Sequence, residues 1–200
     1  MRGLDGGAVS ALIPAAGFSS RMGTPKALLP VAGRPMLEHV GRAFVDGGAW
    51  PLVVVIPPES RPESRPIREL VERLGGVVVM PVTTPPDMTG SIVAGLAELP
   101  PGPFLLAPGD IPSIHAGVVA KLIEIGRLRP DRIAIAAHGG RRAHPLLIPG
   151  DLADELRRDP PASGLDRWIR ARLDRVLEVE FDESGLLEDI DTPEEYRRHA

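Results

Sequence analysis

The sequence contains no cysteine, which excludes disulfide bridges and cysteine-ligated metal sites. No apolar run approaches the roughly 18 residues that a membrane-spanning helix needs. Residues 1–8 also lack the charged-then-apolar pattern of a secretory signal. Basic residues are not in excess, because 23 Lys and Arg stand against 27 Asp and Glu, a formal net charge of −4. That balance argues against nucleic acid as a general electrostatic partner. We therefore expect a cytoplasmic protein that binds neither membrane nor nucleic acid.

Length and composition predict one folded domain. Two hundred residues make a single domain the default, and such a chain can bury a sizeable core without staples. The 23 prolines and 22 glycines mostly separate apolar runs, so they indicate loops rather than disorder. We expect one domain over residues 1–200, with residues 1–8 as an N-terminal tail. The oligomeric state is left open.

Short apolar runs alternate with helical patterns along most of the chain. Strands are predicted at 9–13, 52–56, 77–80, 104–107, 133–137, 146–148 and 176–181. Between them lie amphipathic spacings such as Ile67, Leu70, Val71 and Leu74. This alternation implies right-handed βαβ units. It predicts a three-layer α/β fold whose open, mostly parallel (mixed), Rossmann-like sheet has about seven strands and helices on both faces.

Polar residues before the helical patterns predict where helices begin. Candidate caps are Thr89, Ser113, Asp151 and Ser163. Near the end of the chain, Thr192 is followed by Pro193 and two glutamates, the order of a cap, a first-turn proline and an acidic first turn.

The first strand opens into a loop of small residues that carries two cations. Pro14-Ala15-Ala16-Gly17 follows the strand, and Arg21, Gly23 and Lys26 come next. Small side chains let a ligand approach backbone N–H groups, while Arg21 and Lys26 supply donors and charge suited to phosphate. The spacing matches neither the P-loop nor G-x-G-x-x-G, so a dinucleotide-dependent oxidoreductase is the least favoured of the possible functions.

A carboxylate follows the strand at 104–107. In Pro108-Gly109-Asp110-Ile111-Pro112 the prolines and the glycine make the backbone stiff and tight. Asp110 is placed to hold a hard cation such as Mg²⁺, which commonly takes one or two carboxylates and the phosphate oxygens of a substrate. An aspartate that merely serves the turn is the alternative. Because ligands of such sheets bind beyond the carboxyl ends of the strands, both loops should meet at one edge.

The loop as a whole resembles the signature of the nucleotidyltransferases related to molybdenum cofactor cytidylyltransferase and guanylyltransferase. That signature is A-A-G-x-S-x-R-M-G, then a lysine and L-L-P; this chain has Ala15 to Gly23, Lys26 and Leu28-Leu29-Pro30. The resemblance implies a fold of the nucleotide-diphospho-sugar transferase type. It also implies a nucleotide-binding set: Pro14, Ala15, Ala16, Gly17, Ser19, Ser20, Arg21, Met22, Gly23, Lys26, Gly90 and Ser91. Arg21, Lys26 and Asp110 would be the catalytic residues.

The same resemblance assigns metal ligands. Asp110 matches the family's metal-binding aspartate, and Asp189 matches a second one found in related sugar-nucleotide pyrophosphorylases. Asp191 is a helix cap or a reserve ligand. Both acids could instead serve the N-terminus of the helix that follows, where negative charge is favourable.

His144 remains ambiguous in the sequence. Arg141-Arg142-Ala143-His144-Pro145 resembles the family's R-G-H-P segment, with Ala143 in place of the glycine. His144 could face the acceptor or the base, or could be a structural residue at a strand start.

These features predict a Mg²⁺-dependent enzyme that moves a nucleoside monophosphate from a triphosphate to a phosphate-bearing acceptor and releases pyrophosphate. Pro14 to Gly17 has the form seen in cytidylyltransferases, whereas guanylyl enzymes carry L-A-G-G, so CTP is favoured, with molybdopterin as the acceptor. The acceptor could equally be a sugar phosphate or polyol phosphate. A regulatory protein that binds nucleotide without turning it over is a further alternative.

Overall fold

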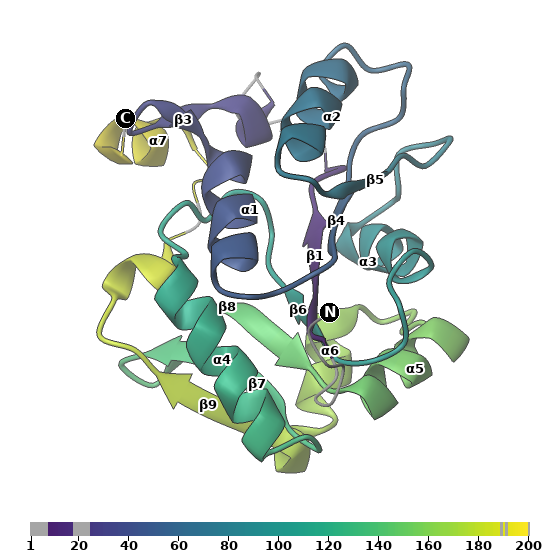
Figure 1. Ribbon diagram of the computed structural model, residues 1–200, viewed down its shortest axis with the longest axis vertical. Helices are drawn as coiled ribbons and strands as arrows, with labels where there is room; N and C mark the ends of the chain where they lie inside the picture. Colours follow the sequence, from purple (N-terminus) through teal and green to yellow (C-terminus); the bar gives the residue numbers. More distant parts are fainter. Residues whose placement is uncertain (1–7, 18–24, 189, 191, 200) are drawn as a thin grey trace, which may run out of the picture.

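A seven-stranded sheet forms the middle layer of the structure (Figure 1), a computed structural model that describes residues 8–17, 25–188, 190 and 192–199. Its strands, in spatial order, are β5 (Val77–Val79), β4 (Leu52–Val55), β1 (Ser10–Pro14), β6 (Phe104–Leu106), β8 (Arg141–Ile148), β7 (Ile133–His138) and β9 (Val176–Glu180). A separate ribbon pairs β2 (Pro30–Val31) with β3 (Arg34–Pro35).

The direction of the strands decides which loops meet. β1 pairs in parallel with β4 and β6, β4 with β5, and β7 with β9. β8 runs antiparallel to both of its neighbours, β6 and β7. The carboxyl ends of the parallel strands therefore share one edge of the sheet, and the amino end of β8 lies at that same edge.

Helices cover both faces of the sheet (Figure 1). α1 (Met36–Asp46), α2 (Ser64–Arg73) and α4 (Ala116–Leu128) pack on one face, and α3 (Met88–Leu96), α5 (Gly150–Arg158) and α6 (Leu165–Arg170) on the other. The remaining elements are η1 (Lys26–Leu28), η2 (Leu173–Arg175), η3 (Ser184–Leu187) and α7 (Pro193–His199). Within the described part of the chain, no helix combines the length and apolarity required to cross a bilayer.

Two apolar clusters make up the core, one on each face. In β1, Ala11 and Ile13 belong to the cluster under α1, α2 and α4, whereas Leu12 belongs to the cluster under α3, α5 and α6. All three are fully buried. Burial on both faces explains why the strands read as continuous apolar runs rather than as alternating ones. The predicted three-layer α/β fold with a mostly parallel, mixed sheet is confirmed.

Two predicted helix caps are wrong because a residue nearby takes the position. α3 begins at Met88, and its cap is Asp87, whose carboxylate accepts the Gly90 N–H at 2.9 Å; Thr89 falls inside the first turn. α4 begins at Ala116 and is capped by His115 rather than by the predicted Ser113; His115 Nδ1 accepts the Gly117 N–H at 3.2 Å.

Two further predicted caps, Asp151 and Ser163, are also wrong, whereas the capping box near the end of the chain is confirmed. Pro149 occupies the N-cap of α5, so Asp151 lies in its first turn, where a negative charge is favourable. Gly164, with φ +86°, replaces Ser163 at the N-cap of α6. The capping box of α7 is confirmed: Thr192 Oγ1 accepts the Glu195 N–H, and Glu195 Oε2 accepts the Thr192 N–H at 2.8 Å.

Candidate active site at the carboxyl edge of the sheet

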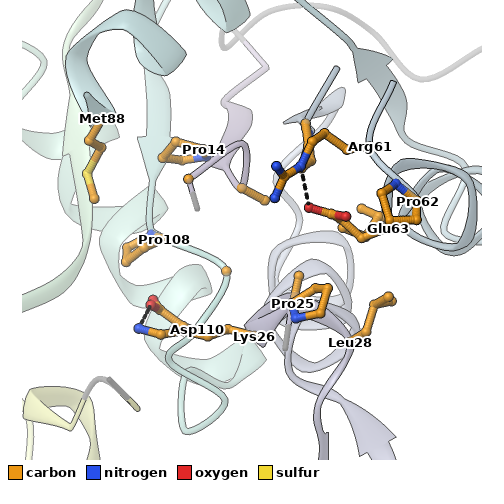
Figure 2. Close-up of a pocket in the computed structure, with 16 residues that line it drawn as sticks. Pro14, Pro25, Lys26, Leu28, Arg61, Pro62, Glu63, Met88, Pro108 and Asp110 are labelled. Carbon is orange, nitrogen blue, oxygen red and sulfur yellow. Dashed lines mark hydrogen bonds and ion pairs between the residues drawn. The ribbon is translucent and has the colours of Figure 1, made fainter. Parts of the chain in front are cut away.

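A cavity of about 680 Å³ opens at the carboxyl edge of the sheet (Figure 2). Its walls come from the end of β1 and the loop after it, η1, the loop between β4 and α2 with the first turn of α2, the start of α3, and the loop after β6. The lining residues are Pro14, Ala15, Gly17, Pro25, Lys26, Ala27, Leu28, Pro57, Arg61, Pro62, Glu63, Ile67, Met88, Pro108, Gly109 and Asp110.

The sheet itself holds the two loops that the sequence singled out. The Ala15 N–H donates to the Val55 carbonyl at 2.8 Å, which ties the start of the first loop to β4. At Gly109, a Cβ would lie 3.1 Å from Leu37 Cδ1 and 3.4 Å from Ile13 Cγ2. The glycine thus lets the backbone before Asp110 pass close to β1 and α1.

Lys26 and Asp110 form an ion pair inside this cavity. Lys26 Nζ lies 3.4 Å from Asp110 Oδ2, and the two side chains are only 15% and 23% exposed. Figure 2 shows both side chains on one wall, below Pro108. The pair places one cation and one carboxylate within reach of the same ligand, which suits a phosphate group with its counter-ion.

The C-terminal segment returns to the same place. The Ile190 N–H donates to the Asp110 carbonyl at 3.2 Å, and Ile190 is buried. Nearby, Ser113 Oγ donates to the Gly185 carbonyl at 2.5 Å. Asp189 and Asp191 lie outside the described residues, so their assignment as metal ligand and cap stays a prediction. Ile190, which stands between these two aspartates in the sequence, is joined to Asp110 by the backbone hydrogen bond given above.

Part of the predicted nucleotide loop also lies outside the described residues. That part comprises Ser19, Ser20, Arg21, Met22 and Gly23, and the roles assigned to them stay predictions. Of the described members of the loop, Pro14, Ala15, Gly17 and Lys26 line the cavity, while the Ala16 side chain is buried in the core.

Gly90 and Ser91 do not line this cavity. They lie in the first turn of α3, where Gly90 donates to the cap and the Ser91 side chain is buried. Met88, at the start of the same helix, lines the cavity and is half exposed. A nucleoside contact from this helix start would therefore involve Met88 at the cavity wall.

The loop between β4 and α2 adds two charged residues that sequence analysis missed. Arg61 and Glu63 line the cavity, and Arg61 Nε donates to Glu63 Oε1 at 3.1 Å. Figure 2 shows the pair across the cavity from Asp110. Their place in the chain could have identified them. The loop that carries them follows a predicted strand of the parallel sheet, and such loops lie at the edge where ligands bind.

The donors in the cavity fit a hard divalent cation shared with a ligand. Over the described ranges, no group of three or more His, Cys, Asp or Glu side chains could enclose a metal ion by itself. Asp110 provides carboxylate oxygens for the cation, and the adjacent Lys26 ammonium group can bind an anionic group of the ligand. Mg²⁺ commonly binds through one or two carboxylates and the phosphate oxygens of a substrate. The residues present fit that mode of binding.

His144 lies in a second, smaller cavity. This cavity, of about 200 Å³, is lined by Ile111, Arg141, Arg142, Ala143, His144, Leu186 and Leu187. Ile111 is the residue directly after Asp110, so the two cavities flank this one turn of chain. His144 is thus set apart from the residues that line the larger cavity.

Comparison with known proteins gives a consistent family and fold. A family model described as "MobA-like NTP transferase domain" matches residues 11–176. A molybdenum cofactor guanylyltransferase of Cupriavidus pinatubonensis is 28% identical over 96% of both chains. A bifunctional protein GlmU of Mycolicibacterium gilvum is 30% identical over 93% of this chain, which spans 33% of that relative's length.

Solved structures share the fold at low identity. A nucleotidyl transferase of Methanothermobacter thermautotroptrophicus superposes with a TM-score of 0.82 at 22% identity, covering 96% of both chains. A Mycobacterium tuberculosis protein solved as a manganese complex gives 0.77 at 23%, covering 96% of this chain and 97% of that one. A CMP:2-keto-3-deoxy-manno-octonic acid synthetase complexed with CTP gives a TM-score of 0.75 at 18% identity, covering 96% of both chains.

Proposed function

The chain belongs to the MobA-like NTP transferase family, a family of nucleotidyltransferase enzymes, and from this premise we propose that it transfers CMP from CTP to molybdopterin. The observation that carries the proposal is the Lys26–Asp110 pair, one cation and one carboxylate 3.4 Å apart in a cavity of about 680 Å³. Nucleotidyl transfer needs alignment and neutralised charge more than covalent help from the protein, and this pair can supply both.

The reaction is a displacement at the α-phosphorus of the nucleotide. An oxygen of the acceptor phosphate forms the new P–O bond, and the bond to the β-phosphate oxygen breaks, so that pyrophosphate leaves. Lys26 donates N–H groups to the phosphates and offsets the negative charge that builds on the α-phosphate and on pyrophosphate. Arg21 is assigned the same task from the sequence. Glycine and alanine in the loop after β1 leave room for the triphosphate close to the backbone.

Asp110 is proposed to hold Mg²⁺ together with Asp189. When bound, the ion would neutralise phosphate charge and hold acceptor and nucleotide in line. In the structure the Asp110 carboxylate contacts the Lys26 ammonium group. In the proposed complex the ligand phosphates would attract the ammonium group, and the carboxylate would contact the metal ion instead. The bond from Ile190 to the Asp110 carbonyl supports a second acidic ligand from this part of the chain.

The choice of CTP is supported by the loop sequence. Pro14 closes β1 and lines the cavity, and the Ala16 methyl packs into the core, where guanylyl enzymes of this kind carry glycine. The name of the Cupriavidus relative points to GTP instead. Equilibrium binding of CTP, GTP, ATP and UTP with Mg²⁺ tests the choice. We expect CTP to bind at least tenfold more tightly than the other three; equal affinities would refute it.

A pyrophosphate-release assay tests the reaction. With CTP, Mg²⁺ and molybdopterin, we expect release that depends on all three components, and loss of release in Asp110→Asn. Release with a sugar phosphate or polyol phosphate, but none with molybdopterin, would replace the acceptor and keep the reaction type. Tight CTP binding without release on any phosphate acceptor would indicate a regulatory nucleotide-binding protein.

A further inference from the structure

The smaller cavity beside Ile111 gathers two arginines and a histidine from one strand. The polar residues that line it are Arg141, Arg142 and His144, and its larger apolar lining residues are Ile111, Leu186 and Leu187. A space of about 200 Å³ accommodates a small group such as a phosphate or carboxylate. Arginine guanidinium groups bind such anions through two parallel hydrogen bonds, and histidine can add a further donor.

The course of β8 explains why these residues meet. β8 runs antiparallel within an otherwise parallel sheet, so its first residues lie at the edge where the other strands end. Its register shifts against β7: Ile135 faces Leu146, whereas Ala137 faces Arg142. An irregularity of this kind bends a strand and re-aims its side chains, and it is frequent next to active sites.

The charges around the cavity favour an anion. Arg142 Nε donates to Glu178 Oε1 on β9 at 2.7 Å, which orients the guanidinium group and leaves its two Nη atoms for other acceptors. Glu180, two residues further along β9, accepts the Gly140 N–H at 3.0 Å through its Oε1. Arg141 is exposed, and no ion pair or side-chain hydrogen bond is found for it among the described residues. The positive charge of Arg141 is therefore not offset by a described carboxylate.

The position of this cavity relative to Asp110 suggests its ligand. Asp110 lines the larger cavity, and Ile111 lines the smaller one, so a substrate can span this turn of chain. The attacking phosphate of the acceptor must lie beside Lys26 and Asp110, where the nucleotide binds. An anion near Arg141 is then a separate group on the distal part of the acceptor; in molybdopterin, whose one phosphate is the attacking group, it would be the dithiolate.

We propose that the cavity formed by Arg141, Arg142 and His144 binds a second anionic group of the acceptor and so selects acceptors that carry one. The proposal rests on the proposed nucleotidyl transfer for the word acceptor, but not for the anion site itself. Arg141 is the main contributor, Arg142 is a second donor held by Glu178, and His144 completes the rim.

Binding of inorganic phosphate tests the anion site independently of turnover. Phosphate is titrated into CTP-saturated protein while the NMR signals of the His144 ring, assigned with His144→Gln, are followed. We expect saturable shifts of these signals, and affinity at least fivefold weaker in Arg141→Gln. Arg129→Gln is the matched control, since Arg129 is an exposed arginine at the C-terminal end of α4 and does not line this cavity. Shifts that do not saturate, or equal affinity in Arg141→Gln and the control, would overturn the proposal.

Steady-state kinetics with CTP and molybdopterin assign the anion to the acceptor. For Arg141→Gln we expect the acceptor KM to rise about tenfold, equivalent to 1.4 kcal/mol, while kcat and the KM for CTP change less than twofold. An unchanged acceptor KM would mean that the cavity takes a free anion and would refute the acceptor assignment. If CTP does not bind, and the same titration without CTP still gives saturable shifts of the His144 signals, the proposed function fails and the anion site stands.

Discussion

Lys26 Nζ and Asp110 Oδ2 lie 3.4 Å apart across a separation of 84 residues, both largely shielded from solvent. The pairing depends on the central position of β1 and β6, because η1 follows the loop after β1 and Asp110 follows β6. Opposite charges held at this distance stabilise each other while no ligand is bound. The same arrangement presents both charges to a ligand that carries phosphate and a cation.

Asp110→Asn should abolish most of the turnover while the protein stays folded. The variant keeps the shape of the side chain but removes the charge that would hold the cation. We expect turnover to fall by about 10²–10³, by analogy with the loss of one electrostatic donor in an active site. Pyrophosphate release and circular dichroism measure the two quantities. Near-normal turnover with a native spectrum would remove Asp110 from the mechanism.

Lys26→Met should lower turnover by a similar factor and should also show coupling to Asp110. Because the two side chains interact directly, the effects of the single variants on the free energy of unfolding should not add in the double variant Lys26→Met/Asp110→Asn. Urea denaturation of all four proteins measures the coupling, for which we expect at least about 0.5 kcal/mol. Strict additivity would show that the contact contributes nothing to the folded state.

Gly109→Ala should disturb the site more than its single methyl group suggests. The added Cβ would press on Leu37 Cδ1 and Ile13 Cγ2, both of which are fully buried. We expect a loss of about 1–3 kcal/mol in the free energy of unfolding from overpacking, together with reduced turnover because Asp110 is displaced. Thermal unfolding and the pyrophosphate assay test this. A variant with wild-type stability and rate would mean that the neighbours yield freely.

Asp87→Ala and Thr89→Ala form a matched pair on α3. Asp87 accepts the Gly90 N–H at 2.9 Å, and Thr89 lies within the helix. Loss of a cap costs about 1 kcal/mol, so Asp87→Ala should lower the free energy of unfolding by that amount. Thr89→Ala should change it by less than about 0.5 kcal/mol. The reverse order in urea denaturation would restore Thr89 as the cap.

Local sequence patterns determined the layers of this protein and the kind of loops at its site. Short apolar runs that alternate with helical spacings specify βαβ units, since a strand buried on both faces is apolar throughout and a helix buried on one face is apolar at helical spacing. Composition and position after a strand likewise predict the loop of small residues from Pro14 to Gly17 and the stiff turn at Asp110. The capping box of Thr192 and Glu195 is equally local, which is why it could be read directly.

Tertiary structure decided what these segments meet. The approach of Lys26 to Asp110, the bond from Ile190 to the Asp110 carbonyl and the presence of Arg61 and Glu63 in the cavity all depend on the spatial order of the strands. That order results from packing between distant segments, which leaves no periodic signal. The choice of Asp87 rather than Thr89 as the cap of α3 has a similar cause. Both residue types can cap a helix, and the backbone conformation that the fold imposes decides which of the two stands at the N-cap.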